Sequence, residues 1–198
     1  MDRARYILAL MLLISWPPGV LLWVAIHPFA RQWRRLGPVW TYAILGVPSL
    51  LMAAAIWRSR GWLLAIDYGT SYLRVALGVV AAVVSAMIAV ERRKQLTFRI
   101  LAGIPELTRG PGRGTILRDG IYGKLRHPRY VEALLAVLAF ALVANYLTLY
   151  VLLLLSLPAL YLVVILEERE LRERFGAEYV AYCREVPRFL PKSWRGES

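Results

Sequence analysis

The chain has 198 residues, of which 59% are hydrophobic, and it carries a formal net charge of +12. An apolar share this far above the roughly 45–50% of ordinary soluble domains indicates an integral membrane protein. Its basic residues stand beside apolar spans, as they do at the cytoplasmic face of a membrane, so we expect membrane lipids and no nucleic acid as partners. The single cysteine, Cys183, excludes an internal disulfide and any multi-cysteine metal site.

Apolar stretches predict where the chain crosses the membrane, because a crossing takes about 20 such residues. Three stretches qualify, and we expect membrane helices at 6–26, 38–57 and 72–90. A fourth apolar region, 131–166, is too long for one crossing and is interrupted at Asn145, so it predicts a helical hairpin. The predicted fold class is an all-α integral membrane protein with about five transmembrane helices, the fourth and fifth forming the hairpin.

A helical pattern continues beyond Leu166, with acidic residues placed four positions before basic ones, as in exposed helices. Four apolar residues share one face of it: Leu171, Phe175, Tyr179 and Tyr182. We expect a cytoplasmic C-terminal helix that folds back onto the membrane domain. The chain then divides into residues 1–90, with three transmembrane helices, and residues 91–198, with a basic linker, the hairpin and the C-terminal helix.

The distribution of Lys and Arg predicts the orientation in the membrane. Segments 91–130 and 167–198 hold ten and seven basic residues, and the loop 27–37 holds three, so five crossings put 20 of the 25 on one side. We therefore expect the N-terminus outside and the C-terminus in the cytoplasm, in the inner or plasma membrane if the source is prokaryotic.

Two charged groups flank the predicted hairpin at its cytoplasmic ends. One is RHPRY at 126–130, and the other is the pair Glu167 and Glu168. Because an antiparallel hairpin brings its two ends together, we expect these groups to face each other. Residue types alone also fit a structural role, in which the arginines reach lipid phosphates and the glutamates form surface ion pairs. With two histidines and no HExxH pattern, we expect no metal site.

The ordered combination of motifs is more specific than either group alone. The stretches GIYGKLRHPRYVEALL (120–135), Glu167-Glu168 and LRERFGAEYVAYCREVPRFLP (171–191) resemble the isoprenylcysteine carboxyl methyltransferase family and the related phospholipid N-methyltransferases. The resemblance covers approximately residues 103–191. The chain departs from the family pattern at Glu132, where glycine is usual, which bears on helix packing and on substrate choice.

The resemblance implies an S-adenosylmethionine-dependent methyltransferase with its active site at the cytoplasmic membrane surface. The implied partners are membrane lipids and a lipophilic methyl acceptor. Matching motif positions imply these cofactor-binding residues: Tyr122, His127, Pro128, Tyr130, Glu167 and Glu168. The candidate catalytic residues are Arg126, whose planar guanidinium suits an acceptor carboxylate, and Glu168. Arg129 fits a lipid-phosphate anchor equally well.

The sequence leaves several reactions open. The first expectation is carboxyl O-methylation of an isoprenylcysteine-like acid, which the closing VPRFLP segment favours over the phospholipid reaction. Such a carboxylate is already ionised at neutral pH and needs no general base. The alternative is N-methylation of a phosphatidylethanolamine-type lipid, in which Glu168 or His127 would remove a proton from the ammonium. A third hypothesis is a non-catalytic membrane protein with the same fold. A membrane reductase of the sterol-reductase type is disfavoured by the predicted number of helices.

Overall fold

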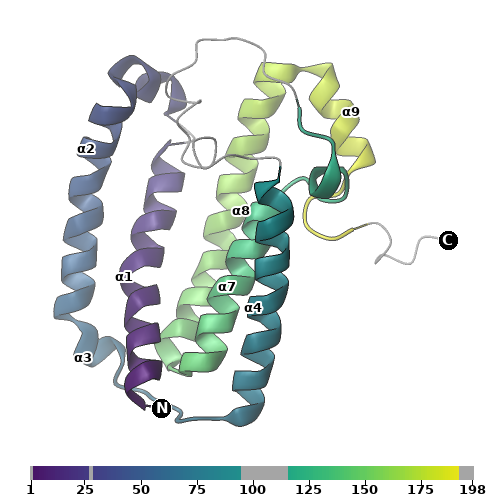
Figure 1. The fold of residues 1–198 in the computed structure, drawn as a ribbon. Coiled ribbons are helices and arrows are strands. Elements are labelled where there is room, and N and C mark those ends of the chain that lie inside the picture. Colours follow the sequence, from purple (N-terminus) through teal and green to yellow (C-terminus); the bar gives the residue numbers. More distant parts are fainter. Residues whose placement is uncertain (1, 27–28, 95–115, 192–198) are drawn as a thin grey trace.

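A computed structural model describes residues 2–26, 29–94 and 116–191 of the chain. Its elements, all helical, are α1 (Asp2–Ile26), α2 (Ala30–Arg58), α3 (Arg60–Leu63), α4 (Tyr72–Arg93), the 3-10 helix η1 (Gly120–Gly123), α7 (Pro128–Ala144), α8 (Leu147–Phe175) and α9 (Ala177–Glu185). The long helices lie side by side in a bundle, with α2 at one edge next to α1 (Figure 1). The predicted all-α fold is confirmed.

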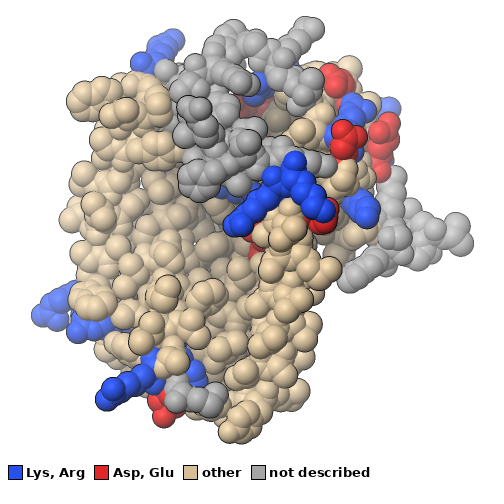
Figure 2. Space-filling view, viewed as in Figure 1, with Lys and Arg blue, Asp and Glu red and all other residues tan. Residues whose placement is uncertain are grey.

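Four helices of the described chain are long and apolar enough to cross a membrane: α1, residues Arg35–Arg58 of α2, α4 and α8. They match the predicted spans and the second arm of the hairpin. The first arm, α7, has 17 residues, fewer than the about 20 that a crossing takes, so the fifth crossing and the orientation of the termini stay predictions. Figure 2 shows an apolar flank over α2 and α4, with charged side chains gathered towards the two ends of the bundle.

The hairpin turn is built on Asn145, as the interrupted apolar run predicted. Asn145 adopts a left-handed conformation (φ 61°) that ends α7, and its side chain is buried. Its Oδ1 accepts hydrogen bonds from Arg74 and Tyr150, and its Nδ2 donates to the carbonyl of Gly69. An asparagine tolerates this backbone better than most residues. The turn thereby joins the hairpin to the loop that precedes α4.

A buried arginine ties the N-terminus to the same end of the bundle. Arg5 donates from Nε to the carbonyl of Ala144 at 3.0 Å and forms ion pairs with Asp2 and Asp67. Its side chain is only 3% exposed. Buried charges are found where partners satisfy them, so this network fixes α1 against the hairpin turn.

Small residues let α4 pack closely along α7. Gly78, Ala81 and Ser85 are buried on one face of α4. A Cβ at Gly78 would lie 2.7 Å from the side chain of Val143 and 3.1 Å from the carbonyl of Ala139, so only glycine fits without movement. Because of this close packing, the last turn of α4 lies beside the beginning of α7.

The C-terminal helix differs in extent from the prediction. Residues from Glu167 to Phe175 continue α8, and the chain turns at Gly176, whose φ of 59° is easiest for glycine. The separate helix α9 then folds back beside the end of α8 (Figure 1). Its buried Tyr179 and Tyr182 pack with Leu171 and Phe175 of α8, the other two residues of the predicted apolar face.

Candidate functional site

The two charged groups that flank the hairpin meet at one end of the bundle. The Nε2 of His127, just before α7, lies 3.1 Å from Oε1 of Glu168 on α8. These two side chains are 3% and 1% exposed. The hairpin therefore brings together the residues that the sequence paired, and it buries them.

Glu168 is the centre of a cluster of positive side chains. Arg188 contacts both of its oxygens, with Nη2 to Oε2 at 2.7 Å and Nε to Oε1 at 3.0 Å. Arg126 lies 3.1 Å from Oε1, and Arg172 lies 3.3 Å from Oε2. A carboxylate buried this completely needs such partners, because an unpaired buried charge costs several kcal/mol. Both oxygens of Glu168 are thus occupied.

Glu167 is the more accessible acid of the pair. Its side chain is 32% exposed, its Oε2 accepts a 2.7 Å hydrogen bond from the hydroxyl of Tyr130, and it lies 3.6 Å from Nδ1 of His127. Burial lowers the pKa of His127, but the hydrogen bonds and charges of the two glutamates outweigh it, so the pKa is raised above its usual value. The imidazole is therefore favoured in its protonated form beside the two carboxylates.

The segment after α9 closes the cluster through the backbone. The N–H of Arg126 donates to the carbonyl of Pro187 at 2.9 Å, and the N–H of His127 donates to that of Arg188 at 3.1 Å. The ring of Phe189 lies 6.1 Å from the imidazole of His127. The closing VPRFLP motif is thus held against the RHP motif.

Arg126 connects the cluster to α9. Its Nη1 contacts Glu168 and the Sγ of Cys183. Its Nε is buried and has no hydrogen-bond partner in the described part of the chain, and the same holds for the hydroxyl of Tyr179. Buried polar atoms without partners are uncommon in native proteins. Their presence here marks the cluster as a place where a polar ligand can supply the missing partners.

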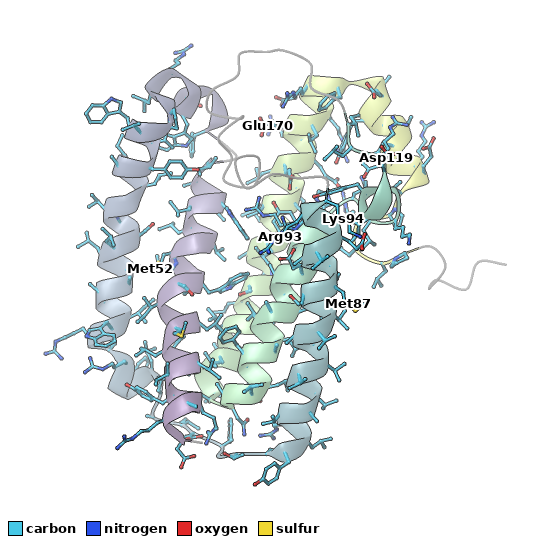
Figure 3. All side chains as sticks on the ribbon, in the orientation of Figure 1. Met52, Met87, Arg93, Lys94, Asp119 and Glu170 are labelled. Atoms are coloured by element: carbon cyan, nitrogen blue, oxygen red, sulfur yellow. The ribbon has the colours of Figure 1, made fainter. Side chains whose placement is uncertain are left out.

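Tyr122 reaches the site from η1. Its carbonyl accepts a 2.6 Å hydrogen bond from the hydroxyl of Tyr182, which fixes η1 to α9. Burial raises the pKa of Tyr122, and among charged groups Arg92 and Glu167 influence it most. The helix η1 also packs against α4, whose last turn holds Arg92. Figure 3 labels Arg93 and Lys94 at the end of α4, and Asp119 beside η1.

Aromatic rings form the wall of the site towards the bundle interior. Tyr130 is 3% exposed and packs edge-on against Trp23 of α1, with ring centroids 5.9 Å apart. Arg129 lies over the other ring of this pair, 4.4 Å from the centroid of Trp23. Pro128 is buried at the first position of α7, where its missing N–H costs nothing. These residues build the site's frame.

Sequence reasoning missed two parts of the site. Arg188 stands in a basic tail, where its type gives no signal, although its place inside VPRFLP could have drawn attention. The other is the ion pair between Arg92 of α4 and Glu132 of α7, with Nε to Oε2 at 2.6 Å, which depends on how the two helices align. Among residues 2–26, 29–94 and 116–191, no three His, Cys, Asp or Glu side chains are grouped as a metal site would require.

A family model described as phospholipid methyltransferase matches residues 73–178, which include the RHP motif and the glutamate pair and make up more than half of the chain. Searches of curated proteins and of solved structures found no match.

Proposed function

Because the chain belongs to the phospholipid methyltransferase family, we propose that it transfers a methyl group from S-adenosylmethionine to a lipophilic acceptor at the membrane surface. The observation that carries the proposal is the cluster of His127, Glu167 and Glu168, closed by the segment at Pro187. It lies at the end of helices that are apolar enough to span a membrane. A site there can meet a water-soluble donor and a lipid acceptor together.

The chemistry of the donor set fits S-adenosylmethionine, which carries an ammonium, a sulfonium, a carboxylate and an adenine ring. The partly exposed carboxylate of Glu167 suits the positive groups. The half-buried ring of Tyr122 and the ring of Phe189 suit the adenine. The guanidinium of Arg188, 34% exposed, suits the carboxylate. When bound, the cofactor would supply an electrophilic methyl group.

The other predicted residues support this pocket in our assignment. Tyr130 holds Glu167 through its hydroxyl, and His127 lies between both carboxylates. Glu168 forms ion pairs with the arginines, and it can bind a cofactor ammonium only if its contact with Arg188 is broken. We therefore assign Glu168 mainly to positioning, and Glu167 to direct contact with the donor's positive charge.

An acceptor carboxylate fits the site best. A carboxylate needs no proton removed, and one of the candidate bases, Glu168, is already bound by guanidinium groups. Arg126, whose Nε has no partner in the described chain, is proposed to orient that carboxylate. We therefore propose carboxyl O-methylation of an isoprenylcysteine-like lipophilic acid.

N-methylation of a phosphatidylethanolamine-type lipid is the second candidate. The description of the matching family names phospholipids, and Glu167 is exposed enough to accept a proton from a substrate ammonium.

Labelled transfer products separate the two reactions. Membranes from cells that make the protein are incubated with methyl-labelled S-adenosylmethionine, and the lipid extract is treated with alkali. Methyl esters release labelled methanol, whereas N-methyl groups remain on the headgroup. Label in neither fraction, compared with membranes that contain Glu167→Gln, would contradict both reactions.

A further inference from the structure

The glutamate pair stands at the end of the apolar part of α8. From Leu147 to Leu166 the helix holds 20 residues without a charged side chain, which is the length of one membrane crossing. Glu167 and Glu168 follow directly. In a membrane, the side chains that surround Glu168 therefore lie at the level of the lipid headgroups, with the hydrocarbon core next to them.

Below this level, one face of α8 is apolar and exposed. Leu154, Tyr161 and Ile165 are 64%, 46% and 42% exposed, and they form what we call the α8 strip. They point in one direction, because they are spaced by seven and four residues along a helix of 3.6 residues per turn. Arg172 continues the same face seven residues after Ile165, and its side chain is 53% exposed. The α8 strip thus leads to an accessible arginine.

A second arginine reaches the head of the α8 strip from the C-terminal segment. Arg188 is 34% exposed, and its Nη1 donates a 3.3 Å hydrogen bond to the hydroxyl of Tyr161. Its Nη2 lies 2.7 Å from Oε2 of Glu168, the same oxygen that Nη2 of Arg172 approaches to 3.3 Å. The two guanidinium groups are therefore neighbours, and both are partly exposed.

Positive charge exceeds negative charge around Glu168. Three guanidinium groups contact its carboxylate: those of Arg126, Arg172 and Arg188. With Glu167 counted, these three groups still stand against two carboxylates. The nearby Arg169 and Glu173 pair with each other and add no net charge. The cluster can accept one more anion, and the planar donor set of a guanidinium suits the oxygens of a phosphate.

We propose that this face of α8 binds one anionic phospholipid of the surrounding bilayer. An acyl chain lies along the α8 strip, and the phosphate lies between Arg172 and Nη1 of Arg188. Tyr161 fits this arrangement, because tyrosines favour the border between hydrocarbon and headgroups. Nε and Nη2 of Arg188 keep their contacts with Glu168, so the bound lipid fixes two of the arginines on which this carboxylate depends. The lipid is a partner of the fold and not the methyl acceptor, so the proposal does not depend on the proposed function.

Native mass spectrometry of the detergent-purified protein tests the proposal. Dioleoyl phosphatidylglycerol is compared with dioleoylglycerol, which has the same acyl chains without the phosphate, and inorganic phosphate is added as a competitor. The variant is Arg172→Gln. Its matched control is Arg184→Gln, which removes the same charge from an exposed side chain of the neighbouring helix α9. Melting temperatures report whether each variant is folded.

The wild type is expected to bind its first phosphatidylglycerol more tightly than dioleoylglycerol. Arg172→Gln should lose about tenfold of that affinity, the order of one charge-assisted hydrogen bond. Arg184→Gln should bind as the wild type does, and inorganic phosphate at the concentration of the lipid should displace none of it. Equal binding of the two lipids, unchanged affinity in folded Arg172→Gln, an equal loss in Arg184→Gln, or displacement by phosphate would overturn the proposal.

A second measurement locates the lipid without any variant. Wild-type protein is irradiated with phosphatidylglycerol that carries a diazirine on one acyl chain, and the labelled peptides are identified. Label should be concentrated on residues 154–165 of α8. The internal comparison is α4, on which Val83, Met87 and Val90 are similarly exposed. Equal labelling of α4 and α8 would contradict a specific site on α8.

Discussion

Replacing Glu168 by glutamine removes the charge on which the positive cluster depends. Two of its partners, Arg126 and His127, are nearly buried and cannot turn to water, whereas Arg172 and Arg188 are 53% and 34% exposed and can rehydrate. Breaking a buried ion pair typically costs about 3–5 kcal/mol. Since half of the partners can relax, we expect a loss of about 3 kcal/mol. For a chain of this size that corresponds to a melting temperature lower by about 6–12 °C.

Thermal unfolding of the purified protein in detergent, followed by tryptophan fluorescence, measures this loss. Glu173→Gln is the matched control, because Glu173 lies on the same helix and pairs with exposed Arg169. An exposed pair contributes roughly 0–1 kcal/mol, so the control should shift the melting temperature by no more than about 4 °C. A Glu168→Gln shift no larger than that of the control would refute the view that Glu168 holds the cluster together.

Three further changes test other parts of the structure. Gly78→Ala should destabilise the protein by about 1–3 kcal/mol, because its Cβ would lie 2.7 Å from a neighbouring side chain, whereas Gly46→Ala, with nothing within 4 Å, should be neutral or stabilising in thermal unfolding. Arg5→Ala should cost about 3–5 kcal/mol and exposed Arg3→Ala almost nothing, and equal melting temperatures would contradict the buried network. The pKa of His127 is raised on folding, so its contribution to stability is complete below about pH 6.5 and is lost as pH rises through the raised native value. Melting temperatures measured from pH 6 upwards should therefore fall more for the wild type than for His127→Gln.

Local sequence patterns predicted most of the architecture. The lengths of the apolar stretches predicted α1, α2, α4 and α8, because a helix that crosses the membrane must be apolar over the thickness of the hydrocarbon core. The break in the apolar run at Asn145 predicted the hairpin. Closure of the hairpin in turn predicted that His127 and Glu168 lie close together. These features depend on residues close together in sequence or on the simple closure of two arms.

Features that depend on the alignment of distant helices were not predictable in the same way. Arg92 and Glu132 are 40 positions apart, and their pairing follows from the close packing that Gly78 allows. Arg188 reaches Glu168 only because backbone hydrogen bonds hold residues 187–188 against the RHP motif. The acidic and basic pattern after Leu166 indicated a helix but not that α8 continues to Phe175 before the turn at Gly176.

The central claim is that the cluster around Glu167 binds a methyl donor. Calorimetric titration of the wild type with S-adenosylhomocysteine, beside Glu167→Gln and the control Glu173→Gln, tests it most directly. We expect binding of micromolar order by the wild type and the control, and a loss of about tenfold or more in Glu167→Gln. A folded wild type that does not bind, or a Glu167→Gln variant that binds equally well, would contradict this claim. The cluster would then have only a structural role at the end of the bundle.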